Sequence, residues 1–243
     1  PLAEQQRIVA KLDALRVRVE QALALQGAAI AERQHWFLSG QQQYFEQLAA
    51  YYGKQPMKGL FSFRQELQRH KSGDRGETKF IGLQHIEPNT GRRIGEDLIQ
   101  IEELAGRKFR FAPGDIVYGY LRPYLNKVWI ADCAGLCSVD QYVLRPDNQK
   151  VSTAYLAYAM RSPVFLKQAE ELTGLLTLPR LRSGLLEQIE IPVPPLEIQE
   201  KAVRHLDALY VAFGELAVLQ QSSLEEIEAL MPAALDRAFR GEL

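Results

Sequence analysis

A stretch of 15 residues at the start of the 243-residue chain occurs a second time near its end. Residues 1–15 align without gaps with residues 195–209 at a constant offset of 194, and eight positions are identical. Each copy opens a long stretch with helical periodicity, which is followed by a phenylalanine and a glycine: Phe37 and Gly40 in the first, Phe239 and Gly241 in the second. A repeat of this kind has to be recognised before the fold is assigned. It predicts a chain laid out as helix, central segment, helix.

Both helical stretches carry side chains at alternating steps of three and four residues, the period of a coiled coil. The two stripes are Ile8, Leu12, Leu15, Val19, Ala22, Gln26 and Ala29, and Leu206, Leu209, Phe213, Leu216, Gln220, Ser223, Ile227 and Leu230. We expect the helices to pair antiparallel, because one enters and the other leaves the central segment. The residues expected to make the coiled-coil or partner contacts are Leu12, Leu15, Val19, Leu206, Leu209, Phe213 and Leu216. Gln26 and Gln220 are related by the same offset and form either a polar layer or the margin of the seam. An ordinary helical hairpin would show the same stripes.

Proline and glycine predict where these helices begin and end. Pro1 and Pro195 stand at helix starts, where the missing N–H costs nothing, and Gly40 and Gly241 are expected to be C-terminal stops. The expected division of the chain is a first helix at 1–40, a connector at 41–53, a mixed domain at 54–193 and a second helix at 194–243.

The central segment alternates short β-forming runs with turn residues. The runs cover residues 79–83, 108–111, 115–121, 127–131 and 137–144. A helix is expected from Ser152, its N-cap, to Arg161, and a second short helix begins at Pro163. The predicted fold class is α+β: a mixed α/β domain together with a long antiparallel two-helix coiled coil.

The net charge of −1 conceals an uneven distribution. Residues 54–186 contain 20 Lys and Arg against 14 Asp and Glu, a net charge of +6, and the rest of the chain has 9 against 16, a net charge of −7. A basic centre between acidic helices is typical of a domain that reads nucleic acid on a protein-binding scaffold. An ordinary solvated surface can carry the same excess.

Basic residues in the centre cluster with aromatic and amide side chains in three expected loops, 84–93, 118–127 and 173–183. Arginine pairs with guanine and Gln or Asn with adenine, whereas Lys, Ser and Thr hold phosphates. The DNA-binding residues expected from these loops are Gln84, His85, Arg92, Arg93, Tyr120, Arg122, Tyr124, Lys127, Arg180 and Arg182. Some of these loop residues have a purely structural alternative. Arg92 and Arg93 could form the solvent-exposed tip of a hairpin, and Tyr118 and Tyr120 could lie on one face of a sheet.

Signatures of catalysis and cofactor binding are not found in the sequence. It has no phosphate-binding loop and no dinucleotide-binding glycine turn, and Cys133 and Cys137 lack the second Cys or His pair that a zinc site needs. We therefore expect no cofactor, no metal and no enzyme activity. Two cysteines do not make a disulfide framework and favour a reduced, cytoplasmic setting, and no apolar run approaches the roughly 20 residues that cross a bilayer.

Several motifs together resemble one protein family. The Pro-Leu-x-x-Gln start of each helix, the Leu-Asp-Ala-Leu that follows and the ending at Phe239–Leu243 are similar to the spacer regions of type I restriction-modification specificity subunits. The central segment resembles a target recognition domain of that family at Gly114–Val117, Leu121–Tyr124, Cys137–Asp140 and Ile189–Pro195. The resemblance covers essentially the whole chain.

The resemblance implies a full subunit with two recognition domains, each reading one half of a bipartite DNA site. Two antiparallel helices set the gap between the half-sites and bind methyltransferase (modification) subunits, which bring S-adenosylmethionine. A restriction/translocase subunit adds ATP-driven translocation and cleavage. This chain has one recognition domain between its spacer helices, so we expect either the C-terminal part of a longer chain, with Pro1 internal and Leu243 a natural end, or a permuted half-subunit that forms a homodimer.

Two alternatives to this function remain open at the level of sequence. One is the specificity module of a type II methyltransferase-linked restriction system. The other is a coiled-coil adaptor whose central domain binds protein. The salt dependence of DNA binding would separate the DNA readers from the adaptor.

Overall fold

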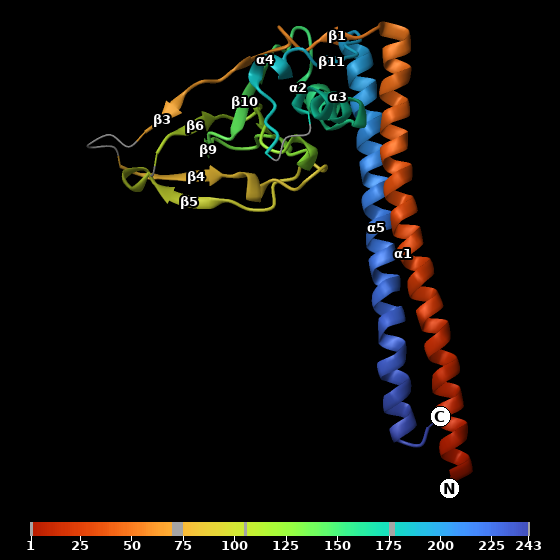
Figure 1. Cartoon of the computed structure of the whole chain (residues 1–243). Helices are drawn as coiled ribbons and strands as arrows, with labels where there is room; N and C mark the ends of the chain where they lie inside the picture. The colour runs from red at the N-terminus through yellow and green to blue at the C-terminus, as the bar shows by residue number, and fades with distance from the viewer. Residues whose placement is uncertain (1, 70–74, 105, 175–177, 243) are drawn as a thin grey trace. The chain divides into compact units, whose positions relative to one another are not determined.

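A computed structural model describes residues 2–69, 75–104, 106–174 and 178–242. It contains two long helices, α1 (Leu2–Tyr52) and α5 (Leu196–Phe239), with a mixed α+β segment between them in the sequence (Figure 1). The chain divides into two compact units, one made of Pro1–Ser39 with Asp207–Leu243 and the other of Gly40–Leu206. The predicted α+β fold class is confirmed. Among the described helices, none combines the length and the apolar character that a membrane span requires.

The first unit is an antiparallel helix pair. Gln26 donates a hydrogen bond from Nε2 to the carbonyl oxygen of Gln220 at 2.7 Å, and Phe37 stacks on Phe213 with ring centroids 4.4 Å apart. From Gln26 to Phe37 the residue number increases along α1, whereas the number of the contacting residue decreases from Gln220 to Phe213 along α5. The two helices are therefore antiparallel. Gln26 and Gln220 are related by the same offset of 194 as the repeat, and this hydrogen bond places the two residues opposite each other in the helix pair.

The seam between the helices follows the predicted stripe only in part. Val19 is buried, and Leu12, Leu15, Leu209 and Phe213 are half-buried. Leu216, however, is 41% exposed, and the half-buried position is Ala217. Leu216 therefore faces away from the seam, and the other half of the expectation, that it contacts a partner, stays a prediction. An α-helix turns once in 3.6 residues, so a stripe that advances by 3.5 residues drifts off a nearly straight helix.

Helix α1 does not end at Gly40, which corrects the predicted stop and makes the expected connector helical. The helix continues to Tyr52 because Phe45 and Leu48 on the following turns are buried in the core of the second unit. A glycine inside a helix costs only about 1 kcal/mol, which this burial offsets. The helix ends at Gly53, whose left-handed φ of 74° lets its N–H bond the carbonyl oxygen of Ala49 at 2.9 Å.

Helix α5 begins and ends where proline and glycine predict. The carbonyl oxygen of Pro195 accepts the N–H groups of Ile198 and Gln199 in the first turn. At the other end Gly241 adopts a φ of 75° and closes a Schellman motif, in which the Glu242 N–H bonds the carbonyl of Arg237. Pro1 lies outside the described residues.

The strands of the second unit form three sheets in the described part of the chain. The smallest pairs β1 (Gln55–Pro56) with β11 (Glu190–Ile191). A four-stranded antiparallel sheet has the order β2 (Phe61–Phe63), β10 (Gln141–Pro146), β7 (Ile116–Gly119) and β8 (Val128–Ile130). A five-stranded mixed sheet has the order β3 (Leu67–Gln68), β6 (Lys108–Phe111), β9 (Gly135–Cys137), β4 (Glu77–Ile81) and β5 (Asp97–Gln100). Only β4 and β9 run parallel among these described pairs.

The predicted run at 137–144 is divided between the two larger sheets. Strand β9 ends at Cys137 and β10 begins at Gln141, because a turn intervenes. In this turn the Gln141 side chain accepts the Ser138 N–H at 3.0 Å. The turn moves the chain from one sheet to the other, so a single apolar run serves two sheets.

Three helices lie in the segment between β10 and α5. They are α2 (Thr153–Arg161), α3 (Pro163–Thr173) and α4 (Ser183–Leu186). The predicted N-cap is confirmed, since Ser152 Oγ accepts the Tyr155 N–H at 3.2 Å. Short 3-10 turns occur at η1 (Leu83–His85), η2 (Ile101–Glu103) and η3 (Pro123–Leu125).

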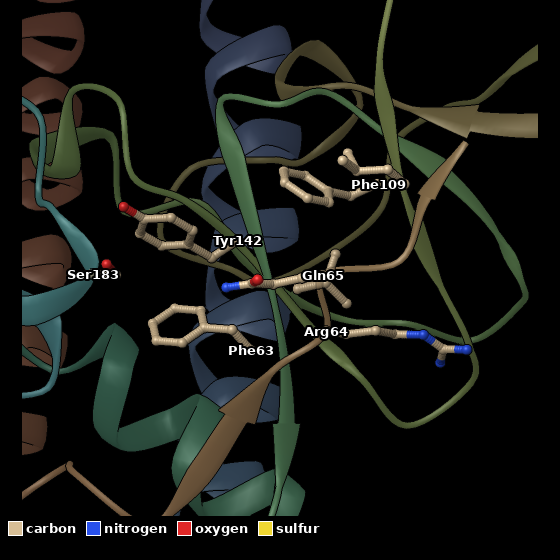
Figure 2. A pocket seen from close by; sticks show the side chains of 8 residues that line it. Phe63, Arg64, Gln65, Phe109, Tyr142 and Ser183 are labelled. Carbon is tan, nitrogen blue, oxygen red and sulfur yellow. The ribbon is translucent and has the colours of Figure 1, made fainter. Parts of the chain in front are cut away.

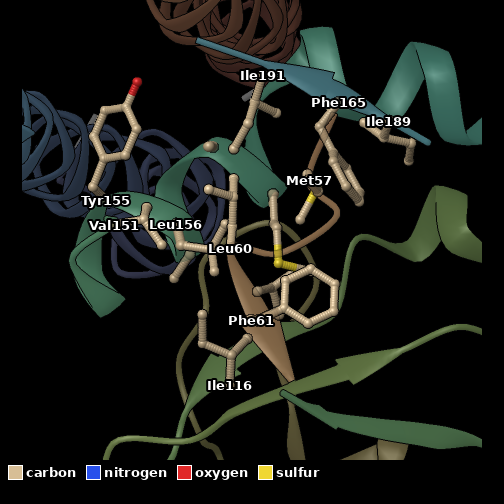
Figure 3. Packing of buried hydrophobic residues seen from close by; sticks show 14 of the residues in the cluster. Met57, Leu60, Phe61, Ile116, Val151, Tyr155, Leu156, Phe165, Ile189 and Ile191 are labelled. Atoms are coloured by element: carbon tan, nitrogen blue, oxygen red, sulfur yellow. The ribbon is translucent and has the colours of Figure 1, made fainter. Parts of the chain in front are cut away.

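The four-stranded sheet separates two hydrophobic clusters. On one face Ile116 and Tyr118 pack with residues of α2, α3 and both long helices, and Figure 3 shows Ile116 beside Phe61 in this larger cluster. On the other face Val117, Trp129 and Val143 pack against the five-stranded sheet. Alternation along each strand divides the side chains in this way. A sheet packed on both faces is a rigid support for the loops at its ends.

The contacts of Gln199 show the structural role of the glutamine in the second copy of the repeated Pro-Leu-x-x-Gln motif. Its side chain is fully buried, and its Nε2 donates to the carbonyl oxygens of Lys150 at 2.9 Å and Pro194 at 2.8 Å. Its Oε1 accepts the Ser152 N–H at 2.8 Å. This one amide ties the first turn of α5 to the segment that leads into α2.

Candidate DNA-binding surface

Two segments far apart in the sequence are joined just beyond the end of β7, an inner strand of the four-stranded sheet. The Leu181 N–H donates to the carbonyl oxygen of Tyr120 at 3.0 Å, and the Arg122 N–H donates to that of Pro179 at 2.9 Å. Leu181 is fully buried, whereas Arg180 and Arg182 on either side of it are exposed. The pairing therefore brings the segment that carries Arg180 and Arg182 beside the segment that carries the exposed Arg122. We call Arg122, Arg180 and Arg182 the arginine surface.

The turn at η3 holds Arg122 in an unusual backbone conformation. Arg122 has a φ of 55° and Asn126, at the far end of the turn, a φ of 48°. Non-glycine residues in this left-handed region are strained by about 1 kcal/mol or more and occur preferentially at functional sites. Asn126 is buried, and its Nδ2 anchors the turn by donating to the Arg161 carbonyl at 2.9 Å. The strained turn presents Arg122 and the exposed Tyr124 to solvent.

A stack of tyrosines underlies two of the arginines. Tyr120 lies on Tyr142 with ring centroids 4.3 Å apart and planes at 21°, and its hydroxyl donates to the Val139 carbonyl at 3.0 Å. Burial raises the pKa of both tyrosines. The negative charge of Asp140 adds to the rise at Tyr120 and the positive charge of Arg180 opposes it, whereas hydrogen bonds from Ser183 and the positive charge of Arg182 oppose the rise at Tyr142. The guanidinium groups thus lie close to a fixed aromatic platform.

The arginine surface is not neutralised by the described part of the chain. No ion pair joins Arg122, Arg180 or Arg182 to a described carboxylate within 4.0 Å. Other arginines of the same unit, such as Arg64 and Arg93, do form ion pairs. Exposed guanidinium groups without a carboxylate partner are suited to phosphate oxygens and guanine edges.

The loop at 84–93 offers fewer side chains for DNA binding than the sequence predicts. Gln84 and Arg92 are exposed, but Arg93 is held by Glu96 at 2.5 Å and Asp132 at 3.2 Å. His85 accepts the Gly82 N–H on Nδ1 at 3.1 Å. Arg93 and His85 thus serve the loop's own structure, for which their sequence positions give no signal.

Lys127 also has an internal partner, since its Nζ donates to the Leu83 carbonyl at 2.6 Å and burial lowers its pKa. This bond attaches Leu83, which directly precedes the 84–93 loop, to the residue before β8. A second link joins the Asn89 side chain to Asn126 Nδ2 at 3.1 Å. The three expected loops therefore converge, and side-chain hydrogen bonds from Lys127 and Asn126 link the first loop to the second.

A pocket of about 230 Å³ beside the tyrosine stack was not predicted from the sequence. Its walls include Phe63, Gln65, Phe109, Tyr142 and Ser183 (Figure 2). The alternation in residues 61–65, with Phe at 61 and 63, is the signal that could have identified the strand there. The pocket itself depends on tertiary structure, because its walls come from separate strands and from α4.

The described residues hold no cluster of three or more His, Cys, Asp or Glu side chains arranged to bind a metal ion.

The helix pair exposes large apolar side chains. Leu25, Val218 and Leu219 are each at least 65% exposed. Such side chains on a helix surface suit a protein partner.

Comparison with known proteins gives consistent matches. The family model described as Type I restriction modification DNA specificity domain matches residues 74–227. The Type I restriction enzyme EcoDI specificity subunit of Escherichia coli is 33% identical over 170 residues, which cover 70% of this chain and 38% of that protein. The EcoAI specificity subunit of the same organism is 29% identical over 165 residues, or 65% of this chain and 28% of that protein. The chain thus spans well under half the length of these relatives.

Two solved structures share the fold along the whole chain. One belongs to a type I R-M system studied for its complex assembly and conformational transition, with a TM-score of 0.77, 23% identity and coverage of 100% of this chain and 60% of that chain. The other is the HsdS subunit from Thermoanaerobacter tengcongensis, with a TM-score of 0.59 and the same identity and coverage. At this level of identity the likeness establishes the fold.

Proposed function

The chain belongs to the family of type I restriction-modification DNA specificity domains, and from this premise we propose that it is the DNA-recognition component of a type I restriction-modification complex. Residues 54–193 would be the target recognition domain, which reads one half of a bipartite DNA site. Helices α1 and α5 would be spacers that bind methyltransferase (modification) subunits. The chain would direct these subunits and a restriction/translocase subunit to double-stranded DNA without catalysing a reaction itself.

The observation that carries this proposal is the arginine surface. Pairing between the two loops at Leu121 and Arg180 gathers three exposed arginines that have no described carboxylate partner. Phosphate contacts by such groups release counterions, so affinity falls with a log–log salt slope of about −0.9 for each phosphate neutralised. Three contacts would contribute about −2.7 to that slope. Exposed Gln84 and Tyr124 lie on loops that converge with this surface and would add contacts to the DNA.

The helix pair supports the partner part of the proposal. Its exposed leucines and valines offer apolar area to methyltransferase subunits, and helices of 51 and 44 residues are long enough to act as spacers. The other half-site would be read by a second recognition domain, either on a longer chain or on a second copy. We place this assembly in the cytoplasm as part of the same proposal, since its target would be cellular DNA.

The decisive experiment compares two double arginine variants of equal charge. Arg180→Ala with Arg182→Ala removes two members of the arginine surface, and Arg69→Ala with Arg107→Ala removes two exposed arginines of the second unit that lie outside the three loops. The full chain, purified with co-expressed methyltransferase subunits, is titrated with duplex DNA between 50 and about 200 mM salt. We expect the first variant to lose at least tenfold in affinity and to reduce the salt slope by about 2. The second variant should bind like the unmodified chain.

Equal affinities and slopes for the two variants would refute the assignment of the arginine surface. Complete insensitivity of the unmodified chain to salt would instead favour a protein-binding adaptor. Mapping of methylated adenines in DNA from cells that carry the complex would then define the target sequence. Both variants should keep the far-ultraviolet circular dichroism of the unmodified chain, because all four arginines are exposed.

A further inference from the structure

The pocket beside the tyrosine stack lies where the chain passes between the two large sheets. Strand β2 ends at Phe63 in the four-stranded sheet, and β3 begins at Leu67 in the five-stranded sheet. The pocket opens at this crossing and has a volume of about 230 Å³. Phe63, Phe109 and Tyr142 give it aromatic walls, with Phe63 edge-on to Tyr142 at 5.2 Å. It can accept a planar or methyl-bearing group about the size of the edge of a nucleobase.

Gln65 supplies a hydrogen-bonding group that the described residues do not use. The Arg64 N–H donates to the Val143 carbonyl at 2.8 Å, so the ladder of β2 and β10 continues past Phe63. Alternation then turns Gln65 toward the same side as Phe63 and turns Arg64 to the other side. Figure 2 shows this arrangement, with the Gln65 side chain reaching toward the rings of Phe63 and Tyr142. No hydrogen bond to a described residue occupies its amide, and the residue is exposed.

The charged residue of the pocket lining already has partners. Arg64 bonds Asp115 through Nη1 at 2.9 Å and Glu66 through Nη2 at 3.0 Å. Its guanidinium group is therefore not available for the O6 and N7 acceptors of guanine. Ser183 is already hydrogen-bonded to Tyr142, so the groups left to a ligand are the amide of Gln65 and three aromatic rings. A glutamine amide matches N6 and N7 of adenine, and apolar contact matches the 5-methyl group of thymine.

The pocket also adjoins the arginine surface. Ser183 directly follows Arg182, and Tyr142 stacks on Tyr120. DNA whose phosphates are held by Arg180 and Arg182 would thus have a base edge within reach of the pocket. We propose that this pocket reads one A·T base pair of the target, with Gln65 as the specificity-determining residue. The proposal rests on the DNA-recognition function proposed above and goes beyond it by assigning a base preference to a residue.

The test is selection from a randomised duplex library by the full chain purified with co-expressed methyltransferase subunits. Three proteins are compared: the unmodified chain, Gln65→Ala, and Gln149→Ala as a matched control, because Gln149 is exposed but does not line this pocket. We expect the unmodified chain to select a motif that contains an A·T pair whose enrichment is lost in Gln65→Ala only. The loss should be about 5- to 150-fold at that position, the discrimination expected of one bidentate contact. Replacing the thymine of that pair by uracil should weaken binding by the unmodified chain several-fold.

The possible failures are distinguishable. An unchanged motif in Gln65→Ala, or a uniform loss of affinity without a change of preference at any position, overturns the pocket's role and leaves the DNA-recognition function standing. Loss of preference at a G·C pair overturns the A·T assignment. Failure of the unmodified chain to enrich any sequence refutes the recognition function and the inference together. Gln65 is exposed, so its truncation should leave the thermal unfolding midpoint unchanged.

Discussion

Replacement of Gln199 by alanine should destabilise the second unit mainly through lost hydrogen bonds. The side chain is fully buried and satisfies three backbone groups, the carbonyls of Lys150 and Pro194 and the N–H of Ser152. Alanine leaves these groups without their partner. The bond to Pro194 lies in a buried environment, so water will replace it least readily.

The expected loss follows from these three bonds. A hydrogen bond of this kind contributes about 1 kcal/mol net, so the free energy of unfolding should fall by about 3 kcal/mol. For a unit of this size, each kcal/mol corresponds to roughly 2–4 °C in the unfolding midpoint. We therefore expect a decrease of about 6–12 °C. Helix propensity works slightly in the opposite direction, because alanine is the better helix former.

The sequence repeat provides the matched control. Gln5 occupies the same position in the first copy of the motif and is exposed, so Gln5→Ala changes propensity equally without removing a buried amide. Its effect should stay within about 0.5 kcal/mol. Trp129 is buried in the second unit, whereas Trp36 is 56% exposed, so urea unfolding followed by tryptophan fluorescence reports mainly on the second unit. Equal midpoints for Gln5→Ala and Gln199→Ala would refute the role assigned to Gln199.

Three further predictions concern the loops, the helix pair and pH. Leu181→Ala should lower the free energy of unfolding by about 2–5 kcal/mol, and DNA affinity should also fall because Leu181 holds the paired loops together. DNA titration at a temperature where the variant is folded tests this prediction, and unchanged affinity would contradict it. Phe37→Ala should destabilise the helix pair by about 3–5 kcal/mol, since Phe37 is 5% exposed and packs on Phe213, while Trp36→Ala should change circular dichroism melting little. A hydrogen bond from Lys79 holds the pKa of Glu96 below its ordinary value of 4.5, so its contribution to stability is complete above that pH and is lost as the pH falls through the folded-state pKa. Acid titration of Glu96→Gln should therefore show a shallower decline than that of the unmodified chain, and parallel curves would exclude this contribution.

The local pattern of the sequence was enough to predict several elements. The predicted run at 108–111 coincides with β6, Ser152 caps α2, and the repeat predicts both long helices. These features depend on residues within a few positions of one another, where periodicity, capping and turn chemistry act. Leu216 shows the limit of such reasoning. Whether a residue of the expected apolar stripe lies in the seam depends on how α1 and α5 pack, which the local sequence does not record.

The DNA-binding residues divide in the same way. Composition predicted a basic centre and the loops that carry it, but it gave Arg93 and Arg180 the same role. Tertiary structure separates them, since two carboxylates hold Arg93 whereas Arg180 is exposed without a described carboxylate partner.

The sequence by itself thus determined the order of elements, the helical repeat and the excess of positive charge in the centre, all of which are recorded in neighbouring residues. Only the tertiary structure decided which charges remain available and which of them share a surface. The physical reason is that ion pairs and sheet pairing join positions far apart in the chain. The bridge between Leu121 and Arg180 forms only when the intervening strands and helices have packed.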